Sequence, residues 1–230
     1  MTYPLIFLPG MMCDSSLFEP QITNFSRDRL VCVAPVSGFD QIENIAAEIL
    51  KVAPKEFILA GLSFGGIVAM EMVRQAPNRI LKIALMDTNH KAELPEMSAK
   101  RIPQIEGVKQ GRLNQIMRDE IKPNYLRTGS KRTSILNLCM AMANDLGGKV
   151  FIEQSIALAS RKDQTETLKQ VKVPTLVLCG RHDRICPIKT HEEIASLVEN
   201  ATLEIIPDAG HLPTLENPEV TNRILQKWLL

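Results

Sequence analysis

Apolar residues gather in six short, uninterrupted runs, and in the stretches between them apolar positions recur at helical spacing. Runs of this length are typical of strands. Because they are continuous and do not alternate with polar residues, they indicate parallel strands covered on both faces. The runs are Leu5–Leu8, Leu30–Ala34, Phe57–Gly61, Ile80–Met86, Pro174–Cys179 and Leu203–Ile206.

Three of the intervening stretches have helical patterns. Ile42–Val52 carries an apolar stripe, and Phe64–Gln75 is apolar nearly all round, as expected for a helix packed on a sheet. Before the last stretch, Asn217 stands where an N-cap belongs and Pro218 at the first helical position. We therefore expect an α/β fold, a mostly parallel sheet of about six strands flanked by helices.

One long segment interrupts the alternation of strands and helices. Between residues 92 and 163 there is no strand pattern, only helical patterns such as Ile135–Leu146 and Phe151–Ala159. We predict that residues 1–91 and 164–230 form an α/β core domain and that residues 92–163 form a helical cap inserted into it.

Composition narrows the class of protein. The 230 residues are 45% hydrophobic and 23% charged, close to the average for soluble globular chains. A net charge of +1 argues against a nucleic-acid-binding surface, and no apolar run approaches the ~18 residues of a membrane span. The five cysteines include no CxxC pair, which favours reduced thiols and a cytoplasmic location.

Charge is unevenly distributed. Residues 91–132 hold ten basic and five acidic side chains, so this stretch is about +5 and the rest of the chain about −4. The excess indicates either an anionic partner or acyl group, or simply solvated helices, and we prefer the second interpretation.

The sharpest motif is Gly61-Leu62-Ser63-Phe64-Gly65-Gly66, between a predicted strand and a predicted helix. A serine hydroxyl is a weak nucleophile and must protrude beside a base and oxyanion donors. A tight strand-to-helix turn achieves this, with glycine at Gly61 and Gly65 relieving crowding and the N–H of Phe64 facing the reaction centre. The alternative, a phosphate-binding turn, lacks both the Walker and the G-x-G-x-x-G patterns.

Four histidines are candidates for the base. His211 follows the last predicted strand, and loops at the carboxyl ends of parallel strands collect ligand-facing residues. Its position after the serine and the acid is the order that this architecture requires. We interpret His182 and His191 as surface or core residues and keep His90 as a candidate pocket residue.

The acid that orients the histidine has two candidates. Asp183 follows the fifth predicted strand and is our choice. Asp87, at the end of the fourth, is the competitor, because an acid there can also reach the histidine loop. Asp208 is interpreted as a turn residue.

The turn Leu8-Pro9-Gly10-Met11 follows the first predicted strand, and the N–H of Met11 is expected to be the second oxyanion donor beside that of Phe64. Cys13 is an alternative nucleophile without a placed partner histidine or acid. No cluster of histidine, cysteine and carboxylate has metal-ligand spacing, so neither a metal nor a cofactor is implied.

These motifs, across nearly the whole chain, resemble the α/β-hydrolase fold superfamily. The resemblance implies that Ser63 is the nucleophile, Asp183 the acid, His211 the base, Met11 and Phe64 the oxyanion donors, and the helical insertion a cap. Two features depart from the family: Pro9 precedes Gly10 where the family often has histidine, and the usual leading hairpin is missing.

The functional prediction is a serine hydrolase that cleaves a small carboxylic ester, thioester or lactone through an acyl-enzyme. Its partner is then a small-molecule acyl substrate, with no nucleic acid and no membrane. The alternatives are hydrolysis of a carbon–carbon bond in a diketone by the same triad, or a receptor whose triad is idle. Because Leu30–Ala34 is expected at a sheet edge, the chain is predicted to be a monomer or a weak homodimer.

Overall fold

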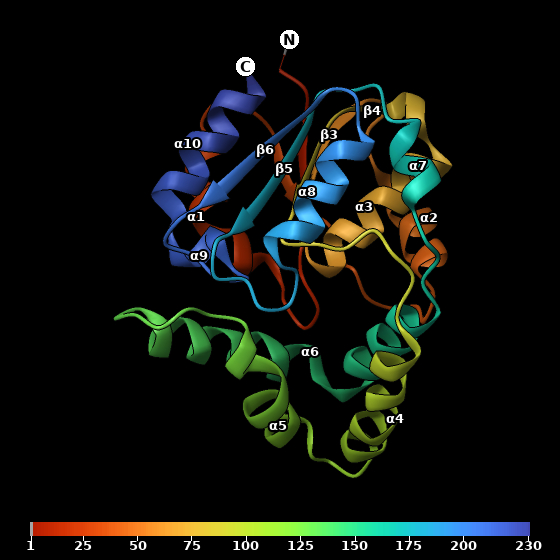
Figure 1. The fold of residues 1–230 in the computed structure, drawn as a ribbon, viewed down its shortest axis with the longest axis vertical. Helices are drawn as coiled ribbons and strands as arrows, with labels where there is room; N and C mark the ends of the chain where they lie inside the picture. Colours follow the sequence, from red (N-terminus) through yellow and green to blue (C-terminus); the bar gives the residue numbers. More distant parts are fainter. Residues whose placement is uncertain (1) are drawn as a thin grey trace.

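A six-stranded sheet forms the centre of the protein in a computed structural model that describes residues 2–230 (Figure 1). The strand order is β2-β1-β3-β4-β5-β6, and every neighbouring pair is parallel. The strands are β1 (Leu5–Leu8), β2 (Val31–Val33), β3 (Phe57–Leu62), β4 (Ile80–Met86), β5 (Thr175–Gly180) and β6 (Ala201–Ile206). The predicted fold class is confirmed, and all six apolar runs are strands.

Helices cover both faces of the sheet (Figure 1). On one face lie α2 (Ile42–Val52), α3 (Phe64–Gln75) and α8 (Ile188–Leu197). On the other lie α1 (Glu19–Phe25) and α10 (Pro218–Leu229). Short turns of helix join these elements: η1 (Ser15–Phe18), η2 (Pro77–Arg79) and α9 (Pro213–Glu216). As predicted, Asn217 caps α10, its side chain accepting the N–H of Val220.

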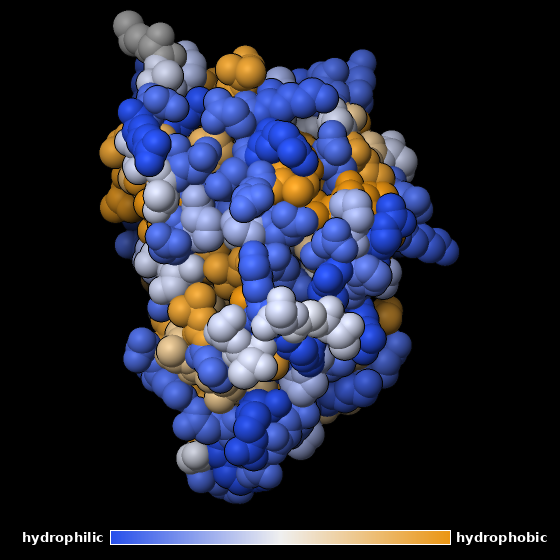
Figure 2. Space-filling view, turned by 90° about the vertical axis from the view of Figure 1, so that its left-hand side faces the viewer, coloured by the Kyte–Doolittle hydropathy of each residue, from blue (hydrophilic) through white to orange (hydrophobic). Residues whose placement is uncertain are grey.

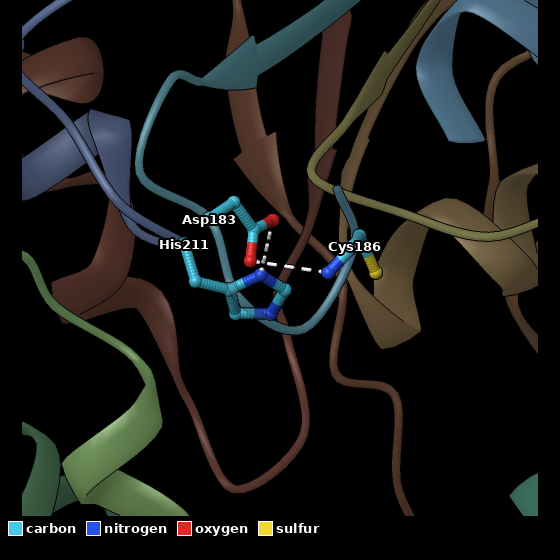
Figure 3. Close-up of side chains that lie close together, drawn as sticks. All are labelled: Asp183, Cys186 and His211. Carbon is cyan, nitrogen blue, oxygen red and sulfur yellow. Dashed lines mark hydrogen bonds and ion pairs between the residues drawn. The ribbon is translucent and has the colours of Figure 1, made fainter. Parts of the chain in front are cut away.

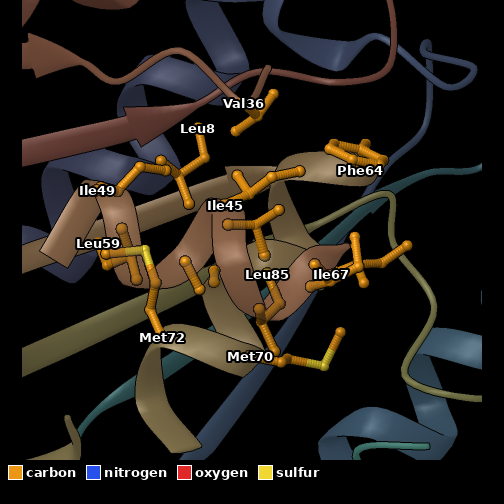
Figure 4. Close-up of a cluster of buried hydrophobic side chains, with 14 of the residues drawn as sticks. Leu8, Val36, Ile45, Ile49, Leu59, Phe64, Ile67, Met70, Met72 and Leu85 are labelled. Atoms are coloured by element: carbon orange, nitrogen blue, oxygen red, sulfur yellow. The ribbon is translucent and has the colours of Figure 1, made fainter. Parts of the chain in front are cut away.

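The sheet divides the apolar core into two layers because successive strand residues point to opposite faces. In β1, Phe7 packs with Phe18 on the α1 side, their ring centroids 4.5 Å apart. Leu8, the next residue, points to the other side, where Figure 4 shows it with Ile45 of α2 and Leu59 of β3. Each such buried side chain stabilises the fold by roughly 1.5–3 kcal/mol.

The chain between β4 and β5 forms a separate group of helices. Figure 1 shows α4 to α6 below the sheet, on the side toward which the arrowheads of β5 and β6 point. The group comprises α4 (Pro95–Lys109), α5 (Leu113–Ile116), the π-helix η3 (Met117–Ile121), η4 (Lys122–Asn124) and α6 (Arg132–Ser160). Next, α7 (Thr165–Lys169) returns the chain to the side of α3 and α8. An inserted helical region is therefore present, and its division from the core at residues 92 and 163 stays a prediction.

Helix α6 is broken at one residue. Gly147 has φ 77° and ψ 173°, values outside the helical region, so the two predicted helices Ile135–Leu146 and Phe151–Ala159 lie on either side of a break. By length and composition alone α6 could cross a membrane. The break leaves two segments, each shorter than the roughly 20 residues that a span needs.

The two chain segments that connect the sheet to the insertion are tied together. The buried carboxylate of Glu93 accepts hydrogen bonds from the guanidinium groups of Arg101 and Arg161. Burial alone would raise the pKa of Glu93, but the two guanidinium groups lower it by more. The pKa of Glu93 is therefore below its usual value. The N–H of Gln164 also donates to the carbonyl of His90 at 2.8 Å.

Charged and polar side chains cover most of the face shown in Figure 2, above all its lower end, where Figure 1 places α4 to α6. Apolar atoms form several separate patches on this face. At one edge of the sheet, Leu30 and Cys32 are exposed in and beside β2. The predicted weak homodimer through this edge stays a prediction.

Candidate active site

Ser63 occupies a strained turn between β3 and α3. Its backbone has φ 54° and ψ −114°, in the left-handed half of the map that non-glycine residues rarely adopt. The turn is tight enough that a Cβ at Gly61 would collide with the carbonyl of Gly65, and a Cβ at Gly65 with the carbonyl of Leu8. The predicted requirement for glycine at both positions is thus explained by backbone contacts on two sides.

The three predicted triad residues meet at the carboxyl edge of the sheet. His211 Nε2 lies 2.9 Å from Ser63 Oγ, and His211 Nδ1 lies 2.8 Å from Asp183 Oδ2. His211 and Asp183 are buried, whereas Ser63 is half-buried and can meet a ligand. The residues come from the ends of β3, β5 and β6, which places them together because parallel strands all end at the same edge.

Asp183 is held ionised by its neighbours. Its other oxygen, Oδ1, accepts the N–H groups of Ile185 at 2.8 Å and Cys186 at 3.1 Å. Burial raises the pKa of Asp183, but His211 and these N–H groups lower it more strongly, so the carboxyl lies below its usual value. An ionised carboxylate on Nδ1 fixes the tautomer that leaves Nε2 free to accept the Ser63 proton.

Asp87, the competing acid, is buried beside the triad but does not contact His211. Its Oδ1 accepts the N–H of Gly180 at 2.9 Å, and its Oδ2 has no hydrogen-bond partner among residues 2–230. Burial, with the nearby charge of Asp183, raises the pKa of Asp87 well above its usual value. The geometry therefore pairs the histidine with Asp183, and Asp87 lies beside that pair without a contact to the imidazole.

The two predicted oxyanion donors, the N–H groups of Met11 and Phe64, belong to the turn after β1 and to the start of α3. A Cβ at Gly10 would lie 3.5 Å from the Cβ of Ser63, which shows how closely the Pro9–Gly10 turn approaches the serine. The N–H of Phe64 begins α3, so no intrahelical acceptor is available to it. Gln154 of the insertion fixes the other turn, its Oε1 accepting the N–H of Met12 at 2.9 Å.

Backbone strain is concentrated here. Three non-glycine residues of the described chain have positive φ: Met12 at 54°, Ser63 at 54° and Asp87 at 44°. They follow the neighbouring strands β1, β3 and β4. Strained residues of this kind cluster at active sites.

The surroundings of the other candidate nucleophile, Cys13, and of the three other histidines differ from those of Ser63 and His211. The thiol of Cys13 donates to the carbonyl of Met11, and burial raises its pKa to about 12, so it is not a reactive thiolate. His191 is fully buried and hydrogen-bonded through both nitrogens, whereas His182 is exposed. His90 is buried at the connection to the insertion, where burial lowers its pKa.

Glu216 is a site residue that the sequence analysis did not single out. Its carboxylate accepts the N–H groups of Gly210 at 2.8 Å and Leu212 at 3.1 Å, on either side of His211. It also accepts the N–H of Arg127 from the insertion at 3.0 Å. Burial raises its pKa in spite of these three hydrogen bonds. The only local signal was its position just before the Asn217 cap.

Tyr125 of the insertion was also missed. Its carbonyl accepts the N–H of His211 at 2.7 Å. Its ring lies 5.3 Å from the imidazole, centroid to centroid, at an angle of 59°. The insertion thus supports the histidine directly, through a contact that no local pattern predicts.

Asp183, Cys186 and His211 lie close enough that one ligand atom of each falls within 4.8 Å of the others (Figure 3). The set fits a metal poorly because two of its members already bond one another. Burial also raises the pKa of the Cys186 thiol well above its usual value, whereas metals bind the thiolate. We interpret Cys186 as a packing neighbour whose N–H orients Asp183.

A model of the alpha/beta hydrolase family matches residues 5–224 of the sequence. The chain belongs to this family. The match includes every strand of the sheet and the inserted helices, so it agrees with the fold and with the serine turn of this alpha/beta hydrolase.

Relatives of this alpha/beta hydrolase are distant. It is 20% identical to the pimeloyl-[acyl-carrier protein] methyl ester esterase of Aliivibrio salmonicida, over 98% of this chain and 91% of the relative. It is 27% identical to the AB hydrolase superfamily protein YisY of Bacillus subtilis, over 98% and 91%. Among solved structures, a thermophilic esterase from Thermogutta terrifontis, with malate bound, is 25% identical. It superposes with a TM-score of 0.90 over 100% of this chain and 90% of that one.

Proposed function

We propose that this alpha/beta hydrolase is a serine esterase that cleaves small carboxylic esters through an acyl-enzyme. The observation that carries the proposal is the series of contacts from Ser63 Oγ to His211 Nε2 at 2.9 Å and from His211 Nδ1 to Asp183 at 2.8 Å. The similarity to esterases in sequence and in structure supports the reaction class.

In the first half of the proposed reaction, His211 Nε2 accepts the hydroxyl proton while Ser63 Oγ attacks the ester carbonyl carbon. The carbonyl oxygen becomes an oxyanion, which the N–H groups of Met11 and Phe64 stabilise. Asp183 stabilises the imidazolium that forms. When the tetrahedral intermediate collapses, His211 gives its proton to the departing alkoxide, and the acyl group stays on Ser63.

In the second half, water attacks the acyl carbon and gives a proton to His211. The same two N–H groups stabilise the second oxyanion. Collapse breaks the bond to Ser63 Oγ, which recovers its proton from the imidazolium, and the carboxylic acid leaves. The enzyme returns to its starting state with one ester and one water converted into an acid and an alcohol.

A panel of p-nitrophenyl esters of graded acyl length tests the proposal. We expect turnover by the wild type and by Ser130→Ala, an exposed-serine control, and a loss of at least about 10³-fold in Ser63→Ala. Tight binding without turnover by any of the three would support the receptor alternative. Turnover of a diketone but not of esters would support carbon–carbon hydrolysis.

Covalent trapping is a second, independent test. A fluorophosphonate should add one phosphonyl group to the intact protein, and peptide mass spectrometry should locate it on Ser63. Labelling of another residue, or none in a folded protein, would contradict the assignment of the nucleophile.

A further inference from the structure

Lys122 is a buried cation in the insertion. It begins η4, directly after the π-helix η3, and its side chain is 1% exposed. Lysine is almost never fully buried unless its charge is paired. A π-helix is rare and is frequently found at functional sites. The local backbone and the burial both indicate a position with a special role.

The ammonium of Lys122 lacks an anion. Within residues 2–230, its Nζ forms neither a hydrogen bond nor an ion pair. The ring of Tyr125 lies beside it, with the ring centroid 4.3 Å from Nζ. A cation–π contact of this kind attracts the charge but leaves the three N–H donors without acceptors.

The polar groups nearest to Lys122 are neutral at physiological pH. Burial raises the pKa of the Tyr125 phenol and that of the Cys13 thiol to about 12, and it also raises the pKa of the third neighbour, the Cys139 thiol. None of the three groups is therefore the counter-ion of the lysine near pH 7. A buried ammonium without an anion is strongly disfavoured, so a carboxylate brought beside it would pair an otherwise unpaired charge.

The position of Lys122 connects it to the triad. The ring of Tyr125 contacts both groups, with its centroid 4.3 Å from the ammonium of Lys122 and 5.3 Å from the imidazole centroid of His211. The nearby Cys13 follows the turn that carries the oxyanion donor Met11, to whose carbonyl it donates. The ammonium thus lies beside the proposed reaction centre and not on the outer surface of the insertion.

Lys122 also differs from the other basic residues of this stretch. Six of the other nine are exposed and three, Arg101, Arg127 and Arg132, are partly exposed, which largely fits the preferred interpretation of solvated helices. Arg118, for example, is paired with Asp119 on the surface. The net charge of residues 91–132 therefore carries little information, whereas one buried lysine within it does.

We propose that Lys122 binds a second carboxylate of the substrate, so that the preferred substrates are monoesters of short dicarboxylic acids; this rests on the proposed ester hydrolysis at Ser63. The two ring contacts place the ammonium and the imidazole at most about 10 Å apart. A distance of about 10 Å corresponds to a contour of roughly seven carbon–carbon bonds of about 1.5 Å. This is a chain of roughly six methylenes between the two carboxyl carbons.

The test compares monomethyl adipate with methyl hexanoate, esters of equal acyl length with and without the distal carboxylate. We measure kcat/KM for both with the wild type, Lys122→Met and Lys131→Met. Methionine keeps the length and apolar stem of the lysine, and Lys131 is an exposed lysine of the same segment. We expect the wild type to prefer the half-ester. Lys122→Met should lower that preference by about 10- to 100-fold, mainly through KM, and Lys131→Met should leave it unchanged.

A binding measurement separates this inference from the proposed function. Ser63→Ala protein, studied by calorimetry, should bind monomethyl adipate at least about tenfold more tightly than methyl hexanoate. If this holds while the wild type hydrolyses neither ester, the lysine site stands and the esterase proposal fails. Equal turnover and equal binding of the two esters would overturn the lysine site and leave the esterase intact. This comparison needs no lysine variant to fold.

Discussion

His191 should make the folded protein sensitive to mild acid. Its imidazole is fully buried, and Nε2 accepts the N–H of Thr88 at 3.0 Å. A backbone N–H can only donate, so Nε2 carries no proton and Nδ1 donates to the carbonyl of Pro187 at 3.2 Å. A second proton would place a charge in the core and remove the hydrogen bond to Thr88. Burial accordingly lowers the pKa of His191 from 6.5 to about 4.

The size and sign of the effect follow from proton linkage. As the pH falls through 6.5, the unfolded chain binds a proton at His191, whereas the folded chain binds it only near pH 4. The unfolded state therefore gains stability first, and the free energy of unfolding decreases between these two values. At about 1.4 kcal/mol per pKa unit, the full loss is about 3 kcal/mol, and it does not grow further below pH 4.

Urea unfolding of the wild type and of His191→Gln at pH 7 and pH 4.5 measures this contribution. Glutamine offers an oxygen to the N–H of Thr88 but does not titrate. The decrease in unfolding free energy should be smaller in His191→Gln by about 2 to 3 kcal/mol, and unchanged in the exposed control His182→Gln. The same pH dependence in all three proteins would refute the reasoning.

Three further substitutions address the site. Asp183→Asn should reduce kcat on p-nitrophenyl acetate by about 10⁴-fold. Asp87→Asn, at a buried carboxyl that does not contact His211 and whose pKa burial raises, should stay within about threefold; equal losses would contradict the assigned pairing. Glu216→Gln should lower the unfolding free energy by about 1–3 kcal/mol, together with kcat, because one carboxylate oxygen accepts the N–H groups of Gly210 and Leu212 and the other that of Arg127, whereas an amide has a single accepting oxygen; an exposed control, Glu219→Gln, should change neither in the same assays. Gly65→Ala should destabilise the fold by at least about 1–3 kcal/mol in urea, since its Cβ meets the carbonyl that ends β1, and a neutral result would mean that the turn is looser than described.

Patterns along the chain predicted the sheet and the meeting of Ser63, Asp183 and His211, for a physical reason. Continuous apolar runs are required of strands buried on both faces, so the hydrophobic pattern alone marks β1 to β6. Parallel strands end at one edge, so polar residues directly after β3, β5 and β6 were expected to meet, and Ser63, Asp183 and His211 do.

The remaining features depend on contacts between distant segments. Glu216 accepts a hydrogen bond from the N–H of Arg127, which is 89 residues away in the sequence. No sequence pattern predicts a contact between residues so far apart. The burial of Lys122 depends on how the insertion packs over the oxyanion turn. In the sequence alone, Lys122 is one of ten basic residues between residues 91 and 132, and nothing distinguishes it from the others.

The left-handed backbone at Met12, Ser63 and Asp87 links thermal tolerance to turnover. Each such conformation is disfavoured by roughly 1–3 kcal/mol and persists because the hydrogen-bonded strands before it allow no relaxation. Exchanging Met12 for glycine would relieve that strain but would also remove a fully buried side chain, which is the larger effect, so the melting temperature would fall. It would also free the backbone next to the proposed oxyanion donor, so stability and catalytic rate would decrease together.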